Sequence, residues 1–260
     1  MKRRVSVDLT AVSSYYTIYN VFRGLRRLCA EGTIDNYRHF WMISVWAAYL
    51  ILYVIAEKVV TTDYYSVHIA LDDLIPFCEW FVIPYCLWMA LLACTAVYLL
   101  FWDAENFKRF TAFIGLGFIP VIIFDMIFPN GQDLRPLAFE HHNIATWLVG
   151  HIYAADSNTN VFPSMHVIGS VALYAASLYT PAFRRHKLHW VMLPLAILIS
   201  ISTAFIKQHS CADILYALPY SAIVWWLVYG VIFKKRRVAQ KSERSSESTP
   251  ELRASSEFEQ

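Results

Sequence analysis

Residues 110–128 read FTAFIGLGFIPVIIFDMIF, and Asp125 is the only charged side chain in this stretch. An apolar helix of this length can cross the hydrocarbon core of a bilayer, which is roughly 30 Å thick. Five more runs of 17 to 28 residues, each with at most one charged side chain, have the same character: 40–56, 75–102, 165–183, 190–206 and 214–233. The chain is 57% hydrophobic and 16% charged, which is atypical of a soluble domain. The sequence therefore predicts an all-α polytopic membrane protein, with a bundle of six transmembrane helices in residues 40–233.

The charges between these runs predict their orientation. Basic side chains gather before the first run, between the second and third, between the fourth and fifth, and after the sixth. In a six-span chain these segments share one side, which the positive-inside rule makes cytoplasmic. Both termini are then cytoplasmic, and the loops 57–74, 129–163 and 207–212 are extracytoplasmic. The polar N-terminus predicts no cleavable signal peptide, so we expect a multi-pass protein of the cell membrane.

The segments that flank the bundle have their own patterns. In the cytoplasmic segment 1–39, apolar residues recur at helical spacing over 12–29. This stretch fits either an amphipathic helix in the inner membrane interface or a linker helix packed on the bundle. The tail 234–260 is rich in Ser and Glu and is expected to be disordered. Residues 144–155 are apolar but too few to span, which predicts an interfacial or re-entrant helix that caps the outer face.

Asn160-Val161-Phe162-Pro163-Ser164-Met165-His166 lies where the second outer loop meets the fourth run. Serine is a favoured N-cap, and the free N–H groups at a helix start attract anions such as phosphate. His166, on the first turn, would point toward that anion. A serine cap with an interfacial histidine is the alternative interpretation.

A second polar cluster, Lys207-Gln208-His209-Ser210-Cys211-Ala212-Asp213, follows the fifth run. At i and i+4, the Asp213 carboxylate can bind one ring nitrogen of His209 and leave the other free as a nucleophile. The alternative is a structural pair that closes a helix end. Cys211 as a catalytic thiol is a less favoured hypothesis.

Arg135, followed by Pro136, is a candidate phosphate ligand because arginine can bind phosphate in bidentate fashion. An interfacial arginine that snorkels to water is the alternative. No metal-ligand set is evident, since the adjacent His141 and His142 are poorly placed to converge on one metal. We therefore expect no metal and no cofactor.

Together these residues resemble the type 2 phosphatidic acid phosphatase superfamily. The family has three motifs: Lys, six residues, then Arg-Pro; Pro-Ser-Gly-His; and Ser-Arg, five residues, His, three residues, Asp. The second motif fits as residues 163–166, with Met in place of Gly. The third fits from Ser202 to Asp213, with Thr203 in place of Arg. The first keeps Arg135-Pro136 but has Phe128 where the family has Lys.

The resemblance implies a role for each residue. His209 is the nucleophile that forms a phosphohistidine, Asp213 orients it, and His166 protonates the leaving alkoxide. The groups that would hold the phosphoryl oxygens are Arg135, Ser164, Lys207 and the N–H groups near Met165. Lys207 is a candidate replacement for the missing cations.

These features predict an integral membrane lipid phosphate phosphatase that works through a phosphohistidine at the extracytoplasmic face. The variant motifs look closer to the branch with inositol phosphorylceramide synthases, so a lipid head-group phosphotransferase is the alternative. A non-catalytic lipid-binding relative is a second alternative, because two family cations are absent. The expected partners are a lipid phosphate substrate and membrane lipids, with no nucleic acid.

Overall fold

The computed structural model describes residues 34–59 and 63–234. The chain divides into two units, Met1–Trp41 and Met42–Gln260, and each is described by itself. The described part of the first unit lies in the 3₁₀-helix η1 (Ile34–Met42). The helix expected over 12–29 and nearly all of the tail expected to be disordered lie outside the described residues.

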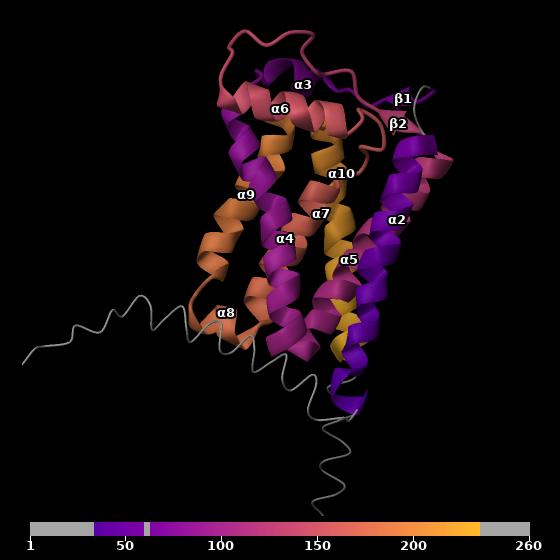
Figure 1. Cartoon of the computed structure of the whole chain (residues 1–260), viewed down its shortest axis with the longest axis vertical. Helices are drawn as coiled ribbons and strands as arrows, with labels where there is room; N and C mark the ends of the chain where they lie inside the picture. Colours follow the sequence, from indigo (N-terminus) through magenta and orange to yellow (C-terminus); the bar gives the residue numbers. More distant parts are fainter. Residues whose placement is uncertain (1–33, 60–62, 235–260) are drawn as a thin grey trace, which may run out of the picture. The chain divides into compact units, whose positions relative to one another are not determined.

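Six apolar helices stand side by side in the described part of the second unit (Figure 1). They are α2 (Ile43–Val59), α4 (Val82–Trp102), α5 (Ala104–Ile127), α7 (Met165–Tyr179), α9 (His189–Phe205) and α10 (Cys211–Trp225), which the π-helix η3 (Trp226–Ile232) extends. Each overlaps one of the predicted runs. The structure is 76% helical with few strands, which confirms the mostly helical class.

The number of membrane crossings stays partly a prediction. Among the described residues, four helical stretches are long and apolar enough to span: Arg38–Val59, Glu79–Trp102, Ala104–Ile127 and Cys211–Ile232. Helices α7 and α9 have 15 and 17 residues and are shorter than these. Helix α7 ends at Tyr179, before the predicted end at 183, because the residue before Pro181 is disfavoured in helical conformation. A new short helix, α8 (Pro181–Arg185), begins at that proline.

Helix α7 packs against α4, α5, α9 and α10. A glycine allows the approach to α4, since a Cβ atom at Gly169 would lie 2.7 Å from Nε1 of Trp88. This contact sets the distance between α4 and the helix that begins with the Pro-Ser-Met-His motif.

Helix α6 (Ile144–Ala155) lies across one end of the bundle, at the same end as α3 (Ala70–Leu74), while α8 lies at the other (Figure 1). The bounds of α6 equal the predicted ones. The Asn143 side chain caps it by accepting hydrogen bonds of 2.9 Å from the N–H groups of Ala145 and Thr146. Its buried residues join α4 and the end of α9 in a small apolar cluster of Val82, Tyr85, Ala145, Val149 and Ile206.

Asn130 holds the long loop 129–163 at the end of the bundle where α6 lies. It pairs with Tyr65 in the short parallel ribbon of β1 (Tyr65–Ser66) and β2 (Asn130–Gly131). Its side-chain amide donates to Asp125 Oδ1 at 2.7 Å, and its Oδ1 accepts from the N–H groups of Val161 and Phe162 at 3.0 and 2.9 Å. The end of α5 therefore holds the backbone that leads into the motif at 163–166.

Candidate active site

The side chain of His209 is oriented by two acceptors. Its Nδ1 lies 3.1 Å from Asp213 Oδ2 and 2.9 Å from the carbonyl oxygen of Val161. Because neither partner can donate, Nδ1 carries the proton, and the lone pair of the neutral ring lies on Nε2. The predicted contact at i and i+4 is present, and the loop carbonyl adds a second partner.

The same aspartate helps to cap the start of α10. Asp213 Oδ2 accepts from the Ser210 N–H at 2.9 Å, and Ser210 Oγ accepts from the Ala212 N–H at 3.1 Å. This is a capping box, so the turn that carries His209 is held by the local rules of helix starts.

His166 lies on the first turn of α7, beside His209. The two imidazole centroids are 5.6 Å apart and the ring planes form an angle of 66°. On the α4 side, the His166 ring packs against Tyr85 and Trp88 at centroid distances of 4.3 and 4.1 Å. These two rings fill the space beside the imidazole on the α4 side.

Ser164 is the N-cap of α7 and is fully buried. Its N–H donates to the Asp213 carbonyl at 3.3 Å, which joins the starts of α7 and α10. Its hydroxyl has no hydrogen-bond partner within the described part of the chain. A buried hydroxyl is normally bonded, but Ser164 is not among the residues that line the cavity beside the histidines, so its phosphate-binding role stays a prediction.

A cavity of about 410 Å³ opens beside the histidine pair. His166, His209, Gln208 and Asp156 contribute to its wall. Further lining side chains come from α2 and α4, among them Tyr49, Tyr53, Glu57, Tyr85 and Trp88. It is large enough for a phosphate and an attached small group, since a water occupies only about 30 Å³ of liquid.

Arg135 does not line this cavity. Its guanidinium donates to the carbonyl oxygens of Tyr153 and Asp156 at 3.3 and 3.1 Å and to Gln208 Oε1 at 2.6 Å. It also lies over the Tyr153 ring, 4.5 Å from the centroid. Burial lowers the pKa of Arg135, and the nearby Asp156 opposes that shift. In this arrangement Arg135 positions Gln208, which does face the cavity.

Lys207 is also directed elsewhere. Its backbone is in the left-handed region, with φ of 55°, and its ammonium donates to the carbonyl oxygens of Asp72 and Ile75 at 2.9 and 2.6 Å. It is buried and is not part of the cavity wall. The structure thus brings His166, His209 and Asp213 together but does not bring the Arg135 or Lys207 side chains to them. Their phosphate-binding roles, like that of the N–H groups near Met165, stay predictions.

Asp72 is a site residue that the sequence reasoning missed. Its carboxylate accepts from Ser210 Oγ and from the Cys211 N–H, both at 2.6 Å. Burial alone would raise the pKa of Asp72, but these hydrogen bonds outweigh it and hold the pKa below its usual value. The two adjacent aspartates, Asp72 and Asp73, in the otherwise apolar stretch 69–75 were the available signal. Glu57 and Asp156 were also missed, because nothing in their spacing places them beside residues 166 and 209.

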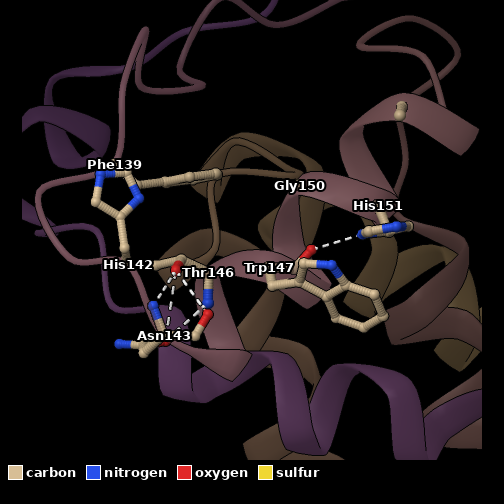
Figure 2. Close-up of a pocket in the computed structure, with 8 residues that line it drawn as sticks. Phe139, His142, Asn143, Thr146, Trp147, Gly150 and His151 are labelled. Atoms are coloured by element: carbon tan, nitrogen blue, oxygen red, sulfur yellow. Dashed lines mark hydrogen bonds between the residues drawn. The ribbon is translucent and has the colours of Figure 1, made fainter.

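His141 and His142 do not join this site. His141 Nδ1 lies 3.5 Å from Glu79 Oε1, and His142 lines a separate groove on α6 with Trp147 and His151 (Figure 2). That groove contains none of the six side chains singled out from the motifs. Within residues 34–59 and 63–234, no group of three or more His, Cys, Asp or Glu side chains is arranged to hold a metal ion. Metal independence stays a prediction.

Comparison with known proteins gives one family match. Residues 132–237 match the family model described as the PAP2 superfamily. The matched stretch contains all six motif residues: Arg135, Ser164, His166, Lys207, His209 and Asp213. No curated protein and no solved structure gives a significant match to the chain.

Proposed function

We propose, from the premise that the chain belongs to the PAP2 superfamily through residues 132–237, that it transfers the phosphoryl group of a membrane lipid phosphate through His209. Members of this superfamily are phosphatases or phosphotransferases. The observation that carries the proposal is the pairing of His209 Nδ1 with Asp213 and the Val161 carbonyl, which leaves Nε2 free to attack.

The chemistry follows from these positions. Nε2 of His209 attacks phosphorus, the bond from phosphorus to the leaving oxygen breaks, and His166 gives that oxygen a proton. Asp213 stabilises the positive charge that develops on the His209 ring. In the second step His166 accepts a proton from water, which attacks the phosphohistidine and releases phosphate.

The membrane setting supports a lipid substrate. The described helices long enough to span place broad apolar surfaces around the bundle. The loop charges support an extracytoplasmic position for the site end, to which the predicted outer loops 57–74 and 129–163 belong. The reaction uses histidine and carboxylate groups and needs no metal, so we expect turnover to continue in excess EDTA.

The cavity favours a second candidate, a head-group phosphotransferase. Its volume of about 410 Å³ leaves room for an alcohol acceptor where a phosphatase needs only water. The placement of Arg135 and Lys207 away from the cavity wall is, in contrast, what a non-catalytic lipid-binding relative would show.

Trapping of the intermediate separates catalysis from binding. Full-length protein is mixed with a lipid phosphate labelled in its phosphorus and denatured at alkaline pH, where the phosphorus–nitrogen bond survives. Label bound to wild type and to His142→Ala, but missing in His209→Ala, is the expected outcome. Wild-type protein that never carries label, with every lipid phosphate offered, would favour the non-catalytic alternative.

A further inference from the structure

The cavity beside the histidine pair carries negative charge and lacks a fixed cation. Glu57 and Asp156 are the two carboxylates among its described lining residues, and none of those residues is Lys or Arg. A lipid phosphate that enters this cavity would meet like charge, which is unfavourable in a partly buried site. A substrate that brings its own positive charge would offset this repulsion.

Within the described residues, neither carboxylate forms an ion pair with a basic side chain. Asp156 accepts from the Tyr53 hydroxyl at 2.6 Å and from Gln208 Nε2 at 3.0 Å. Glu57 accepts from the Ser157 N–H at 3.1 Å and from Asn160 Nδ2 at 3.3 Å. All four donors are neutral, so they orient the carboxylates without cancelling their charge.

Arg135 lies behind this wall, but its guanidinium bonds the backbone carbonyl of Asp156 and not the carboxylate. Burial raises the pKa of Asp156, while the Tyr53 hydrogen bond and the nearby Arg135 act against the shift. A cation in the cavity would favour the charged form of this carboxylate.

Aromatic rings complete the lining. Tyr49 and Tyr53 come from α2, and Tyr85 and Trp88 come from α4. Aromatic faces attract ammonium groups, and aromatic cages recognise quaternary ammonium ligands. Tyr85 and Trp88 also contact His166, so this lining is continuous with the catalytic pair.

We infer that this cavity is a binding site for an ammonium head group, and that the preferred substrates are zwitterionic lipid phosphodiesters. The inference rests on the proposed function for its chemistry. His209 Nε2 attacks phosphorus, the bond from phosphorus to the oxygen of the lipid's glycerol carbon breaks, and His166 protonates that oxygen. The head group stays on His209 with its ammonium against Glu57 and Asp156, until water or an alcohol takes the phosphoryl group.

A matched pair of ligands tests the charge alone. Full-length His209→Ala, which cannot turn the ligand over, is placed in nanodiscs of phosphatidylglycerol and titrated calorimetrically. One ligand is dihexanoyl phosphatidylcholine, and the other is its 3,3-dimethylbutyl analogue, in which carbon replaces the ammonium nitrogen. We expect the choline lipid to bind at least tenfold more tightly, after subtraction of binding to empty nanodiscs.

Variants locate the effect. Glu57→Gln keeps an acceptor oxygen and should remove most of the preference for the choline lipid while binding of the dimethylbutyl lipid stays unchanged. Glu140→Gln, a change of an exposed carboxylate outside the cavity, should retain the full preference. Equal affinity for the two ligands, or no binding of either, would overturn the inference. So would tighter binding of a third ligand, dihexanoyl phosphatidylglycerol, than of the choline lipid. These outcomes do not depend on phosphohistidine formation, so the inference and the proposed function can fail separately.

Discussion

The carboxylate of Asp72 accepts a hydrogen bond of 2.6 Å from the hydroxyl of Ser210, the residue that follows His209. The two residues are 138 positions apart in the chain. The same carboxylate accepts from the Cys211 N–H, at the first turn of α10. The short helix α3 therefore supports the turn that carries His209, although it contributes no side chain to the cavity wall.

Replacement of Asp72 by asparagine should affect both stability and rate. The buried carboxylate makes charge-assisted hydrogen bonds, and their loss should cost about 2 kcal/mol of unfolding free energy. Because the His209 turn loses its support, we expect kcat to fall about tenfold while KM changes little. Initial rates and thermal unfolding in the same detergent measure the two effects.

The neighbouring carboxylate provides the control. Asp73 is exposed and bonds His68, so Asp73→Asn should leave both quantities near wild type. If the two variants behave alike, Asp72 does not support the site in the way its contacts indicate.

Lys207 provides a test between a structural and a phosphate-binding role. Its ammonium holds the carbonyl oxygens of Asp72 and Ile75, so Lys207→Met should lower the unfolding free energy by about 2 kcal/mol. Affinity for orthovanadate, which mimics the transferring phosphoryl group, should change less than about threefold. A direct phosphate ligand would instead be worth about 2–4 kcal/mol of transition-state stabilisation. Loss of vanadate binding with unchanged stability would show that Lys207 reaches the phosphoryl group after all.

The roles of the two histidines differ in their dependence on the leaving group. His209→Ala removes the nucleophile and should abolish turnover of every substrate. His166→Ala removes only the acid, so it should be about 10²–10⁴-fold slower with an alkoxide leaving group and far less impaired with nitrophenolate, which needs little protonation. Initial rates of each variant are measured with a lipid phosphate and with a nitrophenyl phosphate ester. The assignment is reversed if His209→Ala retains nitrophenyl ester activity and His166→Ala has none.

The sidedness of the site can be measured at two exposed positions. Leu137 lies in the loop at the site end, and His186 follows α8 at the opposite end (Figure 1). A membrane-impermeant thiol reagent should label Leu137→Cys in intact cells and His186→Cys only after the cells are permeabilised. The unmodified chain, with its own cysteines, sets the background. The opposite pattern would place the site at the cytoplasmic face.

Local features of the sequence predicted helix bounds and one side-chain contact in addition to the all-α fold class. Helix α6 has the predicted bounds, and α9 differs from its apolar run by one residue at each end. The contact between His209 and Asp213 follows from their spacing, because residues four apart lie on the same face of a helix turn. The predicted end of the fourth run was wrong, since Pro181 stops α7 within an unbroken apolar stretch.

By itself, then, the sequence determined which segments are helical and which residues are chemically able to carry the reaction, because apolar runs, caps and short spacings act over a few residues. Only the tertiary structure decided where the Lys207 and Arg135 side chains point. It also decided that Asp72 lies beside Ser210, and that Glu57 and Asp156 line the cavity. The physical reason is that a buried cation or carboxylate takes the partner that best replaces its lost water. For Lys207 and Asp72 those partners lie more than 130 residues away in the chain, beyond the reach of any local pattern.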